Sequence, residues 1–168
     1  MPTSIRVIEA DLQNPDHQRW TVELMNAYAM DPMGDGKPLS DWARENLIPG
    51  LQQHPTTIIF LAIKGESPVG IAVCFRGFST FAARPLVNIS DYFVLPEHRG
   101  KNIGQRLLEA IEEKARDLGC CKLTLEVQEN NHRARRVYTA AGFSQAVYVA
   151  EAGASLFLAK KLDEFENQ

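Results

Sequence analysis

The amino-acid sequence predicts a single α/β domain with a central, mixed and mostly antiparallel twisted sheet. We expect about six to seven strands in this sheet, flanked by about four helices. Three observations support this fold class. The chain has 168 residues, the size of one ordinary domain. Apolar, β-branched segments are interleaved with segments of helical periodicity. No linker, repeat or low-complexity tract interrupts the chain, so residues 4–162 are predicted as one domain followed by a short tail at 163–168.

The first 54 residues predict a strand and two helices. A short strand is expected over residues 4–10, and a helix over 16–30 with Trp20, Leu24, Ala27 and Tyr28 on one apolar face. Prolines and glycines exclude regular structure in 31–38. Ser40 is the expected N-cap of a second helix, which the Pro49-Gly50 pair is expected to interrupt.

The remaining sequence predicts most of the sheet. Two strands are expected over residues 57–64 and 69–76, joined by turn residues 65–68 and followed by a loop over 77–85. A longer strand over 86–95 precedes a helix over 101–118 that ends at Gly119. A strand over 122–128 and a helix over 131–141 come next. Two final strands, near 145–149 and 155–161, are expected to close the sheet.

The composition excludes several classes of protein. Hydrophobic residues make up 45% and charged residues 23%, with a net charge of −3, so a nucleic-acid-binding surface over the whole fold is not expected. The longest apolar run, Ile58 to Ile63, is too short to span a bilayer. No secretory signal, disulfide framework or metal-ligand spacing is recognised. We therefore predict a cytoplasmic protein without a metal site and without nucleic-acid or membrane partners.

The turn that follows the strand over 86–95 is the most informative segment. Pro96 ends the strand, and the turn from Arg99 to Gly104 opens an amphipathic helix. The first N–H groups of a helix lack intrahelical partners and carry the positive end of the helix dipole. Arg99 and Lys101 add positive charge at the same place. The turn therefore predicts a phosphate site, although a plain glycine-containing turn with solvent-facing basic residues would read similarly. The P-loop and dinucleotide-binding patterns are absent.

Two motifs resemble those of the GNAT acetyltransferases. The run from Val94 to Gly104 is similar to their pyrophosphate-binding motif, [QR]-x-x-G-x-[GA], with Arg99 first and Gly104 last. Asn102 replaces the middle glycine, and asparagine tolerates the positive φ that such a turn requires. The second motif is matched by Asn131, Ala134, Tyr138, Gly142 and Phe143. The predicted order of elements agrees with that fold from about residue 5 to residue 162.

The resemblance implies an acetyltransferase that moves an acetyl group from acetyl-CoA directly to a primary amine of a small molecule. It also implies the residues that hold the donor. Backbone groups near Phe93, Val94 and Leu95 are expected to pair with the pantetheine arm. The pyrophosphate is expected on the turn formed by Arg99, Gly100, Lys101, Asn102, Ile103 and Gly104. Asn131 is expected to contact CoA, to cap the helix that follows, or to do both.

The catalytic candidates are Tyr138, Asp91 and Ser90. By resemblance, Tyr138 supplies a proton or a hydrogen bond to the departing thiolate; otherwise it is a core tyrosine. An amine with a pKa of about 10.4 is protonated at neutral pH, so some group must accept its proton. Asp91 and Ser90 are the candidates, although strand alternation puts them on opposite faces unless a bulge intervenes. Asp91 could instead be a buried acid with a structural partner.

The acceptor amine is less well indicated. The loops over 31–39 and 77–85 are expected to wall its site, with Asp31 and Asp35 attracting a cation or lying as plain surface acids. The segment 78–81 is a candidate apolar wall. Two other functions stay open, a protein or peptide N-acetyltransferase and a non-catalytic acyl-CoA sensor. A homodimer is also left open.

Overall fold

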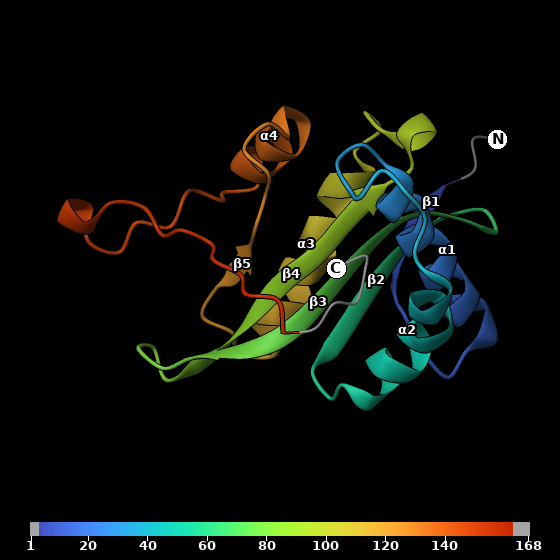
Figure 1. The fold of residues 1–168 in the computed structure, drawn as a ribbon, viewed down its shortest axis with the longest axis horizontal. Coiled ribbons are helices and arrows are strands. Elements are labelled where there is room, and N and C mark those ends of the chain that lie inside the picture. The colour runs from blue at the N-terminus through green and yellow to red at the C-terminus, as the bar shows by residue number, and fades with distance from the viewer. Residues whose placement is uncertain (1–3, 163–168) are drawn as a thin grey trace.

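The computed structural model describes residues 4–162, and its elements follow the predicted order as far as residue 140 (Figure 1). The strands are β1 (Ile5–Glu9), β2 (Thr57–Lys64), β3 (Ser67–Ser79), β4 (Arg84–Val94) and β5 (Leu123–Leu125). The helices are α1 (Pro15–Met30), α2 (Asp41–Gln53), α3 (Ile103–Asp117) and α4 (His132–Ala140). Short 3-10 turns cover Pro96–His98 and Ala150–Ala152. The α/β class is confirmed.

The sheet has the strand order β1-β2-β3-β4-β5. The first four strands are antiparallel neighbours, and β5 joins β4 in parallel through the crossover helix α3. The predicted mixed, mostly antiparallel sheet is therefore confirmed. The β4–β5 pairing covers only Val87–Ile89 against Leu123–Leu125, so the two strands share only a short part of their length.

Helices cover both faces of the sheet. Alternate residues of β2 show this, because Ile58 and Phe60 belong to one apolar cluster whereas Ile59 and Leu61 belong to the other. The first cluster is completed by the predicted stripe of α3, and the second by α1 and α2. Within residues 4–162, no helix combines the length and apolarity needed to cross a membrane.

Two local predictions for the first half of the chain are wrong. Helix α2 is not interrupted at Pro49 but runs on to Gln53. Proline removes one N–H donor and frees the carbonyl four residues earlier, that of Glu45. Both residues are exposed, so water can satisfy that carbonyl. The predicted N-cap is confirmed, since the Ser40 hydroxyl accepts from Ala43 N–H at 3.1 Å.

The predicted loop over 77–85 is also wrong. Strands β3 and β4 continue through most of it, and the pairing extends from Gly77 opposite Leu86 to Ser79 opposite Arg84. Only residues 80–83 form the turn. Gly77 and Pro85 suggested a break, but a glycine and a proline are both tolerated near the end of a long hairpin.

The two final strands predicted near 145–149 and 155–161 are absent, and the sheet has five strands rather than six to seven. A strand needs an edge to pair with. Strand β5 has three residues instead of the expected seven over 122–128, so it offers little edge. The segment 144–162 forms no strand; it first extends to one side of the sheet and then returns toward β5 (Figure 1), and its apolar side chains remain largely exposed, among them Tyr148, Leu156 and Leu158.

Candidate functional site

The turn before α3 has the backbone conformation that an anion site needs. Gly100 has φ of 72°, and Asn102 has φ of 60° in the left-handed region, as expected for an asparagine in the place of glycine. Asn14, Ser40 and Asn131 cap α1, α2 and α4 through their side chains. Among the α-helices of the described chain, α3 alone has no such cap. Its first N–H groups are therefore left for another acceptor.

A tyrosine packs tightly against the first turn of α3. A Cβ atom added at Gly104 would collide with the hydroxyl of Tyr92. The Tyr92 ring in turn meets Tyr138 edge-on, with 5.3 Å between the ring centroids. Glycine at position 104 therefore lets Tyr92 occupy the space between the turn and α4.

One edge of β4 is open beside this turn. Strand β4 pairs with β3 up to Val94, but its pairing with β5 ends at Ile89. Within the part of the chain that the structure describes, no strand lies beside the backbone groups of β4 that face away from β3 beyond Ile89. This agrees with the expectation that backbone near Phe93 and Val94 can pair with an extended ligand. The N–H of Leu95 is not free to pair with such a ligand, because it donates to the Val69 carbonyl at 2.9 Å.

A cavity of about 620 Å³ joins these features. It lies between the turn, β4, the loop after α1 and the start of α4. It brings together ten of the thirteen predicted site residues: Ser90, Phe93, Val94, Arg99, Gly100, Asn102, Ile103, Gly104, Asn131 and Tyr138. Asp91, Leu95 and Lys101 do not line it. Lys101 lies at the surface and donates to the Glu97 carbonyl at 3.1 Å.

Tyr138 lies at the inner wall of this cavity. It is 7% exposed, and its ring contacts Tyr92 and Phe143 edge-on. No described residue hydrogen-bonds to its hydroxyl. Burial, and to a lesser extent the nearby Tyr92 and Tyr28, raise the pKa of Tyr138 above its ordinary value. The phenol therefore stays neutral across the physiological pH range and remains a hydrogen-bond donor.

A β-bulge lies between the other two catalytic candidates. Val73 faces Asp91 but the next residue, Cys74, faces Ile89, so Ser90 is the extra residue. A bulge changes the direction of the side chains around it. The Ser90 and Asp91 side chains therefore need not point to opposite faces of the sheet, as they would in a regular strand. Ser90 lines the cavity and donates to Asn88 Oδ1 at 3.1 Å.

Asp91 is partly buried and does not line the cavity. No hydrogen bond or ion pair to another described residue involves its carboxylate. Burial raises the pKa of Asp91 to about 6. Its charge also raises the pKa of Tyr28, second to burial, so the carboxylate is close to a residue that lines the cavity. The alternative expectation of a buried acid held by a structural partner finds no support among the described residues.

These motifs lie in a stretch that matches a known family. The pattern of the acetyltransferase (GNAT) family matches residues 17–143, more than half of the chain. The chain belongs to the acetyltransferase (GNAT) family. Both sequence motifs fall within the matched residues.

Two curated relatives show how far the sequence similarity extends. The chain is 36% identical over 106 residues to an uncharacterized N-acetyltransferase of Archaeoglobus fulgidus, which covers 62% of this chain and 69% of that protein. It is 35% identical over 79 residues to the bovine thialysine N-epsilon-acetyltransferase, but this covers only 47% of this chain and 46% of the relative.

A solved structure extends the likeness to nearly the whole fold. AAC(6')-Iy in complex with the bisubstrate analog CoA-S-monomethyl-acetylneamine has a TM-score of 0.73 and 18% identity, covering 94% of this chain and 99% of that one. At this identity the likeness concerns the fold alone.

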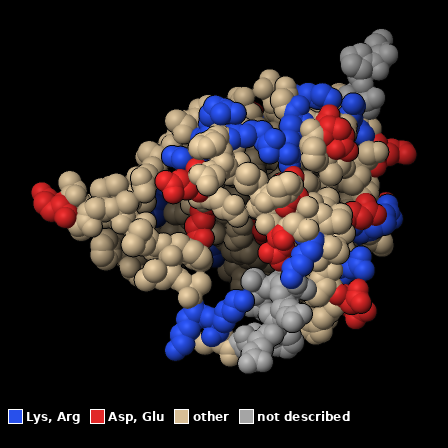
Figure 2. All heavy atoms as spheres, turned by 45° about the horizontal axis from the view of Figure 1, so that its top comes forward, with Lys and Arg blue, Asp and Glu red and all other residues tan. Residues whose placement is uncertain are grey.

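The residues that line the cavity fit acetyl-CoA, the acetyl donor of the GNAT family. Beside the uncapped α3 and the open β4 edge, His98 lines the cavity, and its Nδ1 is the one buried side-chain nitrogen or oxygen atom without a partner in the described chain. An unpaired buried polar atom is costly unless a ligand or water satisfies it. Lys and Arg side chains gather along the part of the surface shown at the top of Figure 2, although the net charge is negative.

Asn131 caps the N-terminus of α4, which confirms one of its two expected roles. Its Oδ1 accepts from Ala134 N–H at 3.2 Å. The residue also lines the cavity, so its amide nitrogen is compatible with a ligand contact.

The expectations for the acceptor walls are partly wrong. Asp31 is not a free surface acid, because it is buried and forms an ion pair with Arg99 at 2.8 Å. Asp35 is exposed and does not line the cavity. The apolar wall expected from residues 78–81 is absent, since Phe81 lies fully exposed at the tip of the β3–β4 hairpin. The hairpin pairing carries this segment away from the site.

Tyr28, Tyr92 and His98 are among the residues of the cavity that sequence reasoning missed. Tyr28 was assigned only to the apolar face of its helix, and the register of that helix against β4 is a tertiary contact. Tyr92 could have been found, because it alternates with Val94 on the face that packs against α3. His98 precedes the turn directly, but its unpaired nitrogen has no sequence signal.

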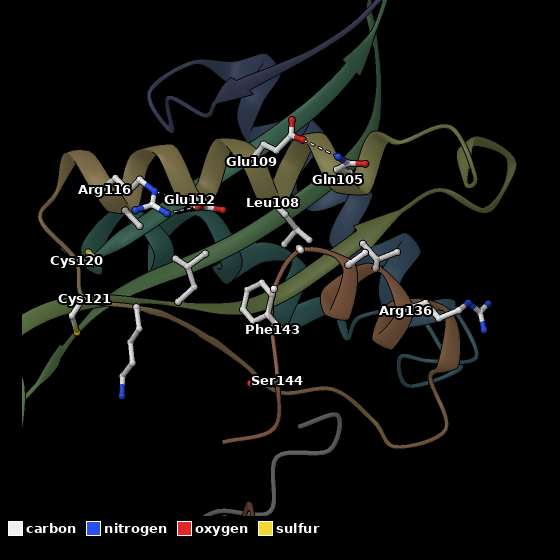
Figure 3. Close-up of a pocket in the computed structure, with 17 residues that line it drawn as sticks. Gln105, Leu108, Glu109, Glu112, Arg116, Cys120, Cys121, Arg136, Phe143 and Ser144 are labelled. Carbon is white, nitrogen blue, oxygen red and sulfur yellow. Dashed lines mark hydrogen bonds and ion pairs between the residues drawn. The ribbon is translucent and has the colours of Figure 1, made fainter. Parts of the chain in front are cut away.

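A second cavity, of about 850 Å³, lies on the other side of α4 (Figure 3). Leu108 and Phe143 border it between α3 and the chain that follows α4. Polar side chains of α3 at its rim are already paired, with Arg116 bonded to Glu112 and Gln105 donating to Glu109 at 3.0 Å. None of the predicted site residues lines this cavity.

Proposed function

We propose that this protein transfers an acetyl group from acetyl-CoA to a primary amine of a small molecule, in the cytoplasm and within a ternary complex. One observation carries the proposal: a single cavity joins the uncapped N-terminus of α3, the open edge of β4 and the buried phenol of Tyr138. Family membership adds the reaction type. Thialysine N-epsilon-acetyltransferase and a structure with an acetylneamine analog among the similar proteins support a small-molecule amine as acceptor.

The donor is held mainly by the backbone. The N–H groups of Ile103, Gly104 and Gln105 face the pyrophosphate oxygens, and Arg99 adds a positive charge. The pantetheine arm lies along the open edge of β4 as an added strand would. The thioester end of the donor then lies near Tyr138, which lines the same cavity.

The transfer itself moves one acyl group and one proton. The amine nitrogen forms a bond to the thioester carbon, and the C–S bond breaks with its electron pair on sulfur. Tyr138 donates a hydrogen bond and then a proton to that sulfur, so that CoA leaves as the thiol. The nitrogen loses a proton toward Asp91 through a water chain past Tyr28 and Ser90. Transfer of that proton to solvent, and uptake of one by Tyr138, restores the enzyme.

The acidities decide when these protons move. A free ammonium has a pKa of about 10.4, so a carboxylate with a pKa of about 6 is a poor base toward it. The acceptor therefore reacts as the small fraction of neutral amine, which has already lost one proton to solvent. The nitrogen becomes far more acidic once it bonds to the carbonyl carbon, and Asp91 then accepts the proton readily. The burial that raises the pKa of Tyr138 also disfavours a charged thiolate in the cavity. The departing sulfur therefore depends more strongly on the hydrogen bond that Tyr138 donates to it.

Titration calorimetry with acetyl-CoA tests the proposal first, with ATP and NAD as control ligands. We expect binding of acetyl-CoA in the micromolar range and no comparable binding of the controls. Release of CoA thiol is then followed with a panel of lysine analogues, aminoglycosides, polyamines and short peptides. A folded protein that binds no acetyl-CoA overturns the proposal. Binding without transfer to any amine favours the acyl-CoA sensor, and turnover confined to peptides favours the peptide acetyltransferase.

A further inference from the structure

Arg99 is held in place by three contacts. Its Nη2 forms the 2.8 Å ion pair with Asp31 Oδ2, and its Nε donates to the Val94 carbonyl at 2.9 Å. The guanidinium also lies over the Phe93 ring, 5.5 Å from the ring centroid. These contacts leave Nη1, with two N–H groups, without a partner among the described residues. The side chain is 20% exposed and lines the cavity.

The Asp31 carboxylate is fixed on both oxygens. Its side chain is 6% exposed. Oδ2 receives Arg99, and Oδ1 accepts from Met33 N–H at 2.9 Å. Burial by itself would raise the pKa of Asp31, but the bonds from Met33 and Arg99 outweigh it and hold that pKa below its ordinary value. A carboxylate paired in this way is not available as a free anion for an amine.

The loop that carries Asp31 also reaches the opposite wall of the cavity. Gln128, which precedes α4, donates to the Met33 carbonyl at 3.3 Å. The loop is itself closed tightly by the bond from Gly34 N–H to the Asp31 carbonyl at 2.8 Å. Asp31 therefore connects the end of α1 to the phosphate turn, 68 residues further along the chain.

We propose that Asp31 is a positioning residue for donor binding: its carboxylate holds the Arg99 fork so that Nη1 faces the diphosphate in the cavity. This inference rests on the proposed function for the identity of the donor. It assigns Asp31 to the donor side of the reaction, although its place in the loop after α1 suggested the acceptor side. A guanidinium that is already fixed loses little side-chain entropy when an anion binds, so less of the binding free energy is lost to ordering it.

The test compares Asp31→Asn with the matched control Asp35→Asn, which removes an exposed acid from the same loop. Calorimetry gives Kd for acetyl-CoA, and steady-state kinetics give KM for the amine. We expect Asp31→Asn to raise Kd at least fivefold and to leave the amine KM within twofold. Asp35→Asn should leave both within twofold. An Asp31→Asn variant with a raised amine KM and an unchanged Kd would make Asp31 an acceptor residue and overturn the inference.

A double-variant cycle separates positioning from a general effect on folding. If Asp31 acts through Arg99, the Kd of Asp31→Asn/Arg99→Gln should not exceed that of Arg99→Gln alone. Effects that multiply, or a lower melting temperature with Kd unchanged, contradict positioning. Inorganic pyrophosphate, titrated against the same variants, keeps this test apart from the proposed function. Weaker pyrophosphate binding in Asp31→Asn supports the inference even if no amine is acetylated, and equal binding overturns it.

Discussion

The two halves of the cavity, which we propose as the donor half and the acceptor half, are built in different ways. The donor half is a continuous stretch, residues 99–104, whose shape comes from two positive φ angles and an uncapped helix. The acceptor half is assembled from side chains of α1, β4 and α4 that are far apart in the sequence. Apart from the effect of the Asp31–Arg99 pair, donor binding should therefore respond mainly to changes that alter the backbone, whereas turnover should respond to changes in single side chains. Four substitutions test this contrast.

Gly104→Ala should have the largest effect, and mainly on donor binding. The added Cβ collides with the Tyr92 hydroxyl, so either the first turn of α3 or the Tyr92 ring has to move. We expect Kd for acetyl-CoA to rise roughly a hundredfold, about 2.7 kcal/mol. Gly50→Ala is the matched control, because a Cβ there meets nothing within 4 Å. Adding Tyr92→Phe to Gly104→Ala removes the colliding hydroxyl and should recover part of the affinity. Unchanged affinity in Gly104→Ala would show that the turn does not depend on this packing.

Tyr138→Phe should lower kcat at least tenfold, as expected when a general acid is removed. Kd for acetyl-CoA should stay within twofold, because the ring and its contacts with Tyr92 and Phe143 are retained. Tyr148→Phe, which alters an exposed tyrosine, is the control. Parallel kinetics and calorimetry on both variants provide the measurement. An unchanged kcat would remove Tyr138 from the chemistry.

Asp91→Asn should lower kcat about tenfold and change its pH dependence. The base acts when ionised, and the pKa of Asp91 lies at about 6. The wild-type rate should therefore fall as the pH drops below 6, and the variant should lose this limb of the profile. Asp35→Asn, at an exposed acid, should keep it. A wild-type profile that is flat between pH 5 and 7 would contradict this assignment.

The same substitution should stabilise the fold at neutral pH. Because burial raises the pKa of Asp91 from 3.8 to about 6, the folded protein binds this proton more tightly than the unfolded chain does. The ionised carboxylate thus lowers stability as the pH rises from 4 to 6. Asp91→Asn should gain at most about 3 kcal/mol at pH 7 and nothing below pH 4. Urea unfolding of both proteins at the two pH values measures this difference.

The contrast between the two halves also explains what the sequence could predict. Glycine, asparagine and an amphipathic helix in one short segment specify the donor turn locally, so Asn102 could be predicted to adopt a positive φ. Asp31 was expected near an amine, but its ion pair with Arg99 depends on how α1 packs against the sheet. The strands expected at 145–149 and 155–161 have suitable residues but find no partner edge, because β5 stops after three residues. Contacts between distant segments depend on how those segments pack together, so no single segment predicts them.

Ser90→Ala should have the smallest effect, and it tests the least predictable feature of the site. The sequence does not show that Ser90 is the extra residue of a bulge, because serine has no special tendency to form one. The bulge is a property of the backbone pairing between β3 and β4, so alanine should preserve it and with it the placement of Asp91. The lost hydroxyl makes one exposed bond, to Asn88. We expect kcat to fall about two- to threefold, with stability changed by less than about 0.5 kcal/mol. A loss of tenfold or more would make the Ser90 hydroxyl an obligatory step in the proton path, and the acceptor half would then depend on two side chains of β4 rather than on Asp91 alone.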